Sequence, residues 1–272
     1  MAQTIPLAII GFGEVGKLFS QQFMARGDVT VAAWDVLMAD PAKGPAMRDA
    51  AKERGVRAAA SAADAAKDAR VVISAVTASS ALDVAGQAAD YLHQGQYFFD
   101  VNSASPVTKK TAAGKVNAAH AKYVEGAVMQ PVGGIGIKVP ILGGGPYAEE
   151  LAGLMNGLGM NITPVTTEPG RASAMKLCRS IVIKGMEAIM VDCAAAAKHW
   201  GVEDEVFASL NQTWPSIDFR ELAEYMGERV ATHGVRRAAE MREAAMMVED
   251  LGMNPGLAAA IADAQERGAK KK

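Results

Sequence analysis

The sequence predicts an α/β N-terminal half with a doubly wound parallel sheet, followed by an all-α C-terminal half. Three observations carry this prediction. Short apolar runs alternate with helical stretches over about the first 165 residues. A cluster of glycines ends the first apolar run and opens a helix. After Thr166 the strand pattern stops, and long stretches of helix-forming residues follow.

The apolar runs are bounded by residues that end strands or helices. The helical period after the first run stops at Gly27, a residue type that commonly follows the last turn of a helix. The second run ends in Asp35. The expected strands are Ile5 to Ile10, Val29 to Trp34, Val71 to Ala75, Tyr97 to Val101, Lys122 to Val128, Val139 to Leu142 and Ile162 to Val165.

The change of pattern near Thr166 predicts two domains, residues 1–165 and 166–272. Thr167 is the expected cap of the helix that follows, with Pro169 near its first turn. This helix is expected from Arg171 to Trp200. Further helices are expected between breaks near Gly201, Trp214 and Pro215, Gly234, and Gly252 to Pro255.

The composition of the 272 residues argues against several classes of protein. A formal net charge of -2 disfavours binding to nucleic acid, which depends on neutralising phosphates. No apolar stretch reaches the roughly 20 residues of a membrane span, and the first residues lack the pattern of a signal peptide. Cys178 and Cys193 fit reduced packing residues, and no cluster has metal-ligand spacing. We therefore expect a cytoplasmic protein with a small-molecule substrate and no metal, nucleic acid or membrane partner.

The glycine cluster has the sequence GFGEVG. It follows an apolar strand and opens a helix, which is the context in which G-x-G-x-x-G binds a dinucleotide in a Rossmann domain. The first glycine permits a tight turn, the second lets the backbone approach a pyrophosphate, and the third lets the helix pack on the strand. The helix N-terminus offers N–H groups and partial positive charge to the anion. The expected cofactor residues here are Gly11, Phe12, Gly13, Glu14, Val15 and Gly16.

Asp35 decides which nicotinamide cofactor the sequence favours. A carboxylate at the end of the second strand accepts hydrogen bonds from the ribose hydroxyls of NAD and repels the extra phosphate of NADP. Lys43 and Arg48 could still reach that phosphate if the loop folds back, so NAD is favoured and NADP stays possible. The segment after the third strand is expected on the nicotinamide side, although its threonine could equally serve only as a helix cap. It comprises Ala75, Val76 and Thr77.

Four motifs occur in a definite order along the chain. They are GFGEVG, DVNSASP from Asp100 to Pro106, EGAVMQPVGG from Glu125 to Gly134, and GRASAMKLCRS from Gly170 to Ser180. Their order resembles that of the β-hydroxyacid dehydrogenase family, which includes phosphogluconate dehydrogenase and 3-hydroxyisobutyrate dehydrogenase. The resemblance covers nearly the whole chain and is strongest to a divergent phosphogluconate-dehydrogenase-like subgroup. It implies hydride transfer between an alcohol and a nicotinamide cofactor.

The resemblance also implies roles for single residues. Lys176 matches the lysine that serves the family as catalytic acid/base. Ser103, with Asn102 beside it, matches the residue that contacts substrate and nicotinamide.

Two departures from the family pattern bear on the substrate. The family's Ser-Gly-Gly, which holds the substrate carboxylate, is replaced by Met129-Gln130-Pro131. The Asn pair after the lysine is replaced by Arg179 and Ser180. The dehydrogenase motifs are thus kept, while the groups that would hold an ordinary small β-hydroxy acid differ.

The residues around Lys176 support a catalytic role for it independently. A lysine acts as a base only when neutral, and an apolar helix lowers its pKa from about 10.4 by burying it. Ser180 lies one turn further on, and Lys184 lies on a flank of the same face. Both are expected substrate-binding residues. The resemblance further implies a positive side chain near the substrate in the late helical region, where Arg236 or Arg237 is the nearest match. Arg237 is the expected residue, because a guanidinium can bind a carboxylate or phosphate through two hydrogen bonds.

Each of these assignments has an alternative. Lys184 could instead pair with Glu187 or Asp192, and the arginine could belong to a salt-bridged helix surface, as in a pair between Arg236 and Glu240.

The leading functional hypothesis is an NAD(P)-dependent dehydrogenase or reductase acting on a substituted hydroxy acid or related polar alcohol. An imine reductase is an alternative, although relatives of that kind usually carry another residue at the place of Lys176. A non-catalytic NAD(P)-binding protein is a second alternative. The long Ala-rich helices have more apolar face than one Rossmann domain can cover, so we expect a homodimer or a higher homo-oligomer.

Overall fold

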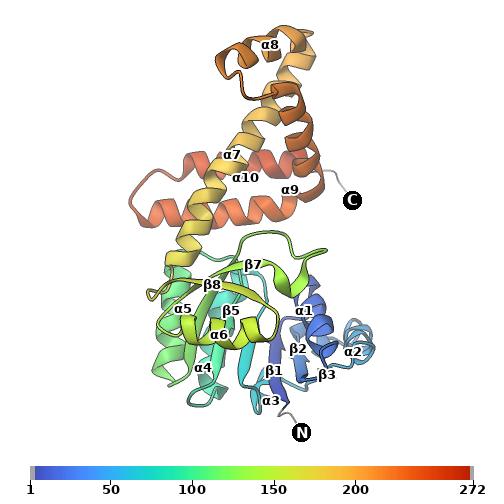
Figure 1. Ribbon diagram of the computed structural model, residues 1–272, viewed down its shortest axis with the longest axis vertical. Helices are drawn as coiled ribbons and strands as arrows, with labels where there is room; N and C mark the ends of the chain where they lie inside the picture. The colour runs from blue at the N-terminus through green and yellow to red at the C-terminus, as the bar shows by residue number, and fades with distance from the viewer. Residues whose placement is uncertain (1–3, 270–272) are drawn as a thin grey trace. The chain divides into compact units, whose positions relative to one another are not determined.

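The computed structural model describes residues 4–269 and divides into two compact units, Met1–Lys176 and Leu177–Lys272. The first unit holds an eight-stranded sheet in the order β3-β2-β1-β4-β5-β6-β7-β8 (Figure 1). Its strands are β1 (Ile5–Ile10), β2 (Val29–Trp34), β3 (Arg57–Ala58), β4 (Val71–Ser74), β5 (Tyr97–Asp100), β6 (Lys122–Val128), β7 (Pro140–Gly144) and β8 (Asn161–Thr166).

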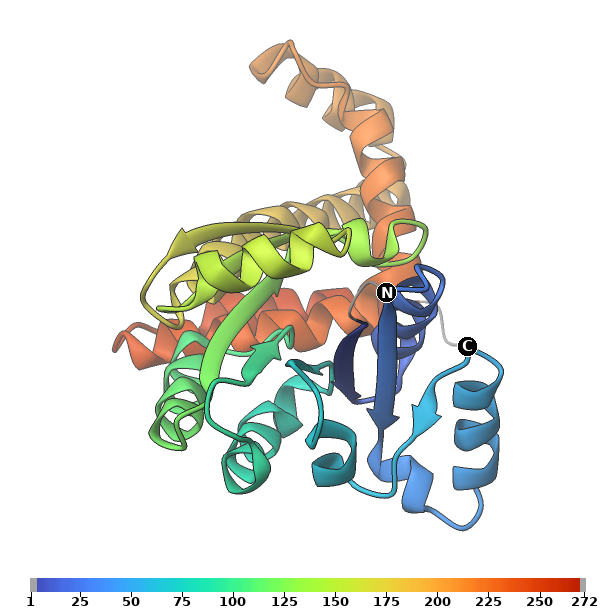
Figure 2. The same ribbon diagram turned by 60° about the horizontal axis from the view of Figure 1, so that its bottom comes forward.

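Helices cover both faces of this sheet because its inner strands are apolar on both faces. In Figure 2, α1 (Glu14–Met24) and α6 (Ala148–Gly157) lie on one side of the strands. On the other side lie α4 (Ala81–Tyr91) and α5 (Pro106–Ala118). Along β1, Leu7 and Ile9 pack into the first layer, whereas Ala8 and Ile10 pack into the second. Shorter helices complete the connections: η1 (Val36–Ala39), α2 (Gly44–Lys52), α3 (Ala62–Ala66), η2 (Ala78–Ser80) and η3 (Gly136–Lys138).

The predicted Rossmann architecture is confirmed, but the sheet is mixed rather than purely parallel. Strands β1 to β6 run parallel, whereas β7 pairs antiparallel with β6 and parallel with β8. Residues 129–139 connect β6 to β7 and contain only the short helix η3, without the α-helix that usually forms a parallel crossover. The chain therefore turns back at this point. The sequence analysis also missed β3, a two-residue edge strand.

The second unit is helical. It contains the larger part of α7 (Arg171–Trp200), with α8 (Glu203–Thr213), α9 (Phe219–Asp250) and α10 (Gly256–Gly268). Helix α10 packs along α9 (Figure 1). The two backbones meet at Gly234, where a Cβ would lie 2.1 Å from the Gln265 carbonyl oxygen, so only glycine permits this approach. A separate apolar cluster joins Met190 of α7 to Phe207, Phe219, Ala223 and Met226.

The division between the two units falls within α7. The boundary predicted near residue 165 lies at the end of β8, whereas the compact units divide further on, between Lys176 and Leu177 of α7. Among the residues that the structure describes, no helix is both long enough and apolar enough to cross a membrane.

Candidate cofactor and catalytic site

The glycine motif forms the turn between β1 and α1. Gly11 has φ +95°, and a Cβ on it would lie 2.3 Å from the Ala75 carbonyl oxygen. A Cβ on Gly16 would lie 2.1 Å from the Gly11 carbonyl oxygen. Gly13 differs, because nothing lies within 4 Å of a Cβ built on it, and it precedes α1 without a side-chain cap. The first turn of α1 thus faces open space across a residue without a side chain, which fits a pyrophosphate.

Asp35 ties this turn to the end of β2. Its Oδ2 accepts a hydrogen bond of 2.7 Å from the Phe12 N–H, and its Oδ1 accepts one of 2.9 Å from the Leu37 N–H. Each carboxylate oxygen keeps acceptor capacity beyond the bond that it receives. The arrangement therefore fits a role in binding the ribose hydroxyls of NAD while the same carboxylate holds the turn in place.

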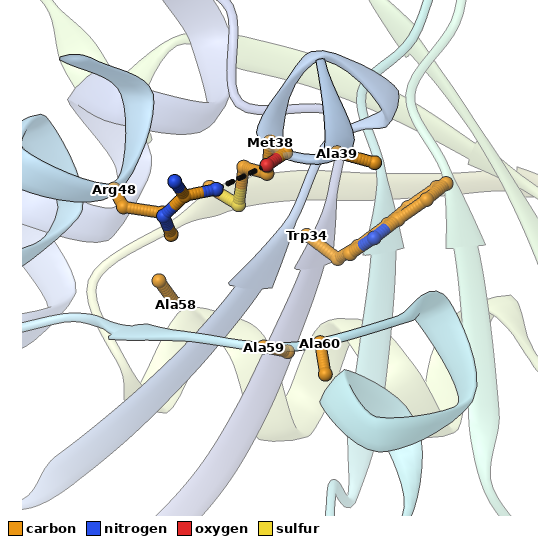
Figure 3. A pocket seen from close by; sticks show the side chains of 7 residues that line it. All are labelled: Trp34, Met38, Ala39, Arg48, Ala58, Ala59 and Ala60. Carbon is orange, nitrogen blue, oxygen red and sulfur yellow. Dashed lines mark hydrogen bonds between the residues drawn. The ribbon is translucent and has the colours of Figure 1, made fainter. Parts of the chain in front are cut away.

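A cavity of about 300 Å³ lies beside the end of β2. We call it the Trp34 cavity. Figure 3 shows the Trp34 ring and the Arg48 side chain on opposite sides of it. Arg48 donates a hydrogen bond to the Met38 carbonyl. Trp34, which lines the cavity, directly precedes Asp35 in the sequence. The flat Trp34 ring and the Arg48 guanidinium suit an adenosine. Its lining residues are Trp34, Met38, Ala39, Arg48, Ala58, Ala59 and Ala60.

The segments after β4 and β5 are held together by Asn102. Its Oδ1 accepts a hydrogen bond of 2.6 Å from the Val76 N–H, and its Nδ2 donates to Ser74 Oγ at 3.0 Å. Ala75 to Thr77 and Asn102 therefore lie together at the carboxyl ends of adjacent strands. The Thr77 side chain makes no capping bond to η2, and it instead contacts the hydroxyls of Ser79 and Ser80.

Lys176 and Ser103 come together from segments far apart in the sequence. Ser103 follows β5, and Lys176 lies in the second turn of α7. The Lys176 Nζ donates a hydrogen bond to the Ser103 Oγ, and both side chains are half-buried. The structure thus joins the expected catalytic lysine to the serine that resembles the family's substrate-contacting residue.

Three buried residues missed by the sequence analysis support this loop. Asp100 Oδ1 accepts from the Asn102 N–H at 3.0 Å and from its Nδ2 at 2.7 Å, and it pairs with Lys109 Nζ at 2.8 Å. Asp100 Oδ2 accepts from the Tyr123 hydroxyl at 2.8 Å. Burial, followed by the charge of Asp100, raises the pKa of Tyr123 well above its usual range, so Tyr123 stays a donor.

One signal for Lys109 was available in the sequence. Ala112, Ala113 and Val116 follow it at helical spacing, and all four residues are buried on one face of α5.

The other expected substrate residues lie in the helical unit. Ser180 Oγ donates to Glu240 Oε1 at 2.6 Å, and Lys184 Nζ contacts the same oxygen at 2.8 Å and Ser180 Oγ at 3.0 Å. Burial lowers the pKa of Lys184, whereas the charge of Glu240 opposes this shift. Lys184 therefore pairs with Glu240 rather than with Glu187 or Asp192.

Arg237 is held by a different carboxylate. It is buried, and its guanidinium forms an ion pair with the fully buried Glu187, with Nε donating to Oε2 at 2.9 Å. Its role toward a substrate stays a prediction. In the described part of the chain no three His, Cys, Asp or Glu residues are grouped as metal ligands would be.

Comparisons with known proteins identify the families that the two parts of the chain match. Residues 6–152 match the family described as the NAD binding domain of 6-phosphogluconate dehydrogenase. Residues 197–268 match a domain of unknown function, DUF1932.

The whole chain has relatives of known sequence or structure. An uncharacterized 28.5 kDa protein from Methanothermus fervidus is 31% identical over 207 residues, covering 76% of each chain. A conserved hypothetical protein from Sinorhizobium meliloti 1021 is 37% identical, with a TM-score of 0.84 over 97% of this chain and 88% of the other. The conserved protein MTH1747 is 31% identical, with a TM-score of 0.77 over 97% of this chain and 98% of the other. Its structure is described as similar to 3-hydroxyacid dehydrogenases.

Proposed function

Because this chain belongs to the family of the NAD binding domain of 6-phosphogluconate dehydrogenase and has a 3-hydroxyacid dehydrogenase-like fold, we propose that it is an NAD(P)-dependent oxidoreductase. Its substrate is a substituted hydroxy acid or a related polar alcohol, and Lys176 is its acid/base. The observation that carries this proposal is the hydrogen bond between Lys176 Nζ and Ser103 Oγ. A half-buried lysine bonded to a hydroxyl provides a base and a holding group at one place.

The proton movements follow from these two residues. Neutral Lys176 takes the proton of the substrate hydroxyl while the carbon that bears this hydroxyl is oxidised. In the reverse reduction, Lys176 returns a proton to the substrate oxygen. Ser103 accepts a hydrogen bond from Lys176 and keeps its own O–H free to donate to the substrate oxygen. Asn102 fixes the backbone on which Ser103 is placed. The bound nicotinamide supplies the hydride acceptor or donor.

We propose that NAD is the preferred cofactor. Asp35 places a negative charge at the end of β2, where it favours ribose hydroxyls and opposes a phosphate. Arg48 lies nearby in the Trp34 cavity, but one of its N–H groups is bonded to the Met38 carbonyl, which restrains the guanidinium from turning toward the phosphate of NADP.

The first test is thermal stabilisation by NAD, NADH, NADP and NADPH in turn. A ligand at 100 times its Kd adds about 2.7 kcal/mol to the free energy of unfolding. A screen of hydroxy acids, polar alcohols and cyclic imines then follows turnover by nicotinamide absorbance. We expect Lys176→Ala to bind NAD as the wild type does and to lose turnover, with the exposed Lys110→Ala as the matched control. No stabilisation by any of the four cofactors would refute the proposal, and turnover of imines alone would replace it with an imine reductase.

We further propose that the helical unit forms a homodimer through one face of α7. Val182, Met186, Ile189 and Trp200 are 60%, 40%, 68% and 76% exposed. At about 100° per residue they form a single apolar stripe. A two-fold axis brings this stripe against its copy, so one surface is complementary to itself. In sedimentation equilibrium we expect a dimer that Ile189→Asp converts to monomers, while Leu257→Asp, an exposed site off the stripe, leaves it dimeric. A monomeric wild type would contradict the proposal.

A further inference from the structure

Glu125 is a fully buried carboxylate in the middle of β6. Its Oε1 accepts hydrogen bonds from the Gly170 N–H at 2.8 Å and the Ala172 N–H at 3.0 Å. Its Oε2 accepts from Ser173 twice, from the N–H at 3.3 Å and from the hydroxyl at 2.7 Å. A single side chain from the sheet thus receives four hydrogen bonds from the start of α7.

Three of these donors are backbone N–H groups at the start of a helix, which a helix leaves without partners. The first N–H groups of α7 have no carbonyl in the preceding turn, and they carry the positive end of the helix dipole. Glu125 satisfies them and places its negative charge against that positive end. Thr167, the cap expected from the sequence, precedes the start of α7 at Arg171 and does not have this role. The earlier expectation failed because the cap comes from a strand far away in the sequence.

The surroundings leave little freedom to Glu125. A Cβ on Gly144, the residue opposite it on β7, would lie 2.4 Å from Glu125 Oε1. Gly170 has φ +93°, and a Cβ on it would lie 2.7 Å from the Pro106 carbonyl oxygen. The carboxylate and the start of α7 can therefore meet only because both positions are glycine.

Glu125 also lies beside Asp100, the residue that supports the loop carrying Ser103. In the parallel pairing of β5 with β6, Asp100 is opposite Glu125. Asp100 anchors Asn102 and the loop that carries Ser103, and its charge is balanced by Lys109. Glu125 anchors the first turn of α7, and Lys176 lies less than one turn beyond Ser173.

We propose that Glu125 is a positioning residue, which fixes the start of α7 so that Lys176 reaches Ser103. Because a helix advances about 100° per residue, a helix rotated by one residue would point Lys176 away from Ser103. Asp100 and Glu125, side by side in the sheet, thus set the two ends of the bond between Ser103 and Lys176. This role rests on the proposed function only in so far as Lys176 is the acid/base.

The test uses the whole protein without substrate. Glu125→Gln keeps the side-chain volume but turns one acceptor into an amide donor that faces N–H groups. Lysines are labelled with an amine-reactive reagent, and the rate at each is followed by mass spectrometry. We expect Lys176 to be labelled at least about threefold faster in Glu125→Gln, since a bonded, half-buried amine becomes free. Glu125→Asp, which keeps the charge, is expected to give an intermediate rate.

Lys109 is the internal control, because it is fully buried in the same unit and reacts only when that unit opens. Faster labelling of Lys176 alone supports positioning. Equal acceleration of both lysines, or none at Lys176, overturns it. If Glu125→Gln does not fold, Ser173→Ala decides, because it removes one donor to Glu125 and should accelerate Lys176 by a smaller factor. A positive result without turnover of any substrate would disprove the proposed function while leaving the positioning role intact.

Discussion

Replacing Asp35 by alanine tests the cofactor site most directly. The side chain has two separable roles, since its oxygens accept the N–H groups of Phe12 and Leu37 at 2.7 and 2.9 Å and its charge faces any group bound at the end of β2. Loss of the two backbone contacts loosens the turn for every dinucleotide. Loss of the charge, by contrast, acts oppositely on NAD and NADP. The ratio of the two affinities therefore isolates the effect of the charge.

The expected size follows from the hydrogen bonds and the charge. Hydrogen bonds from the ribose hydroxyls of NAD to the charged Asp35 carboxylate contribute about 2 kcal/mol. Without them, NAD should bind to Asp35→Ala roughly 30-fold more weakly. Removing the repulsion between a carboxylate and a phosphate a few Å apart in water-like surroundings returns about 1.4 kcal/mol, or roughly tenfold, to NADP. The preference for NAD should thus fall by about 300-fold.

Titration calorimetry with NAD and NADP measures this ratio directly. Asp40→Ala is the matched control, because Asp40 accepts hydrogen bonds from the Ala42 and Lys43 N–H groups but follows η1 instead of β2. We expect its preference to equal that of the wild type. If Asp35→Ala weakens NAD and NADP by the same factor, Asp35 only supports the turn, and the reasoning on cofactor preference fails.

Three further outcomes are expected. Gly144→Ala should cost about 1–3 kcal/mol of unfolding free energy in urea, because its Cβ overlaps Glu125; a neutral result would contradict that packing. Lys109→Met should cost about 3–5 kcal/mol by leaving Asp100 buried and unpaired, while Lys110→Met should cost almost nothing in the same assay. Burial lowers the pKa of Lys184 below its ordinary value of 10.5 in the folded protein. The unfolded chain therefore binds this proton more tightly than the folded protein does. As a result, the contribution of Lys184 to the unfolding free energy rises with pH until about 10.5. Unfolding curves for Lys184→Met should lack this contribution, and an unchanged pH slope would argue against it.

The strands were predictable because buried parallel strands consist almost entirely of apolar residues. Val71–Ser74 and Tyr97–Asp100 stand out for that reason. Strand direction has no such local signal. The reversal of β7 goes with a connection, 129–139, that holds only η3, and the edge strand Arg57–Ala58 is too short to show any periodicity.

The site was predictable where its residues belong to contiguous motifs. Gly11 to Gly16, Ser103 and Lys176 were found in this way. Asp100 and Glu125 lie inside the same motifs but at the ends or centres of expected strands, where their chemistry was not evident. A buried carboxylate is explained only by its partners, and those of Glu125 begin 45 residues later in the chain. Such pairings become visible only in the folded structure.

The reversal of β7 also bears on the order in which the sheet assembles. Gly126 pairs with Gly143, a short way along the chain, whereas Leu7 must find Val71 across β2, β3 and their helices. Closing the longer loop costs more chain entropy, so pairing within β6, β7 and β8 is favoured early and the contact of β1 with β4 late. The Gly11 turn packs against Ala75 at that late contact. During refolding, the glycine turn between β1 and α1 is therefore completed after β6, the strand that anchors α7. Added NAD, which binds at this turn, should slow unfolding more than it speeds folding.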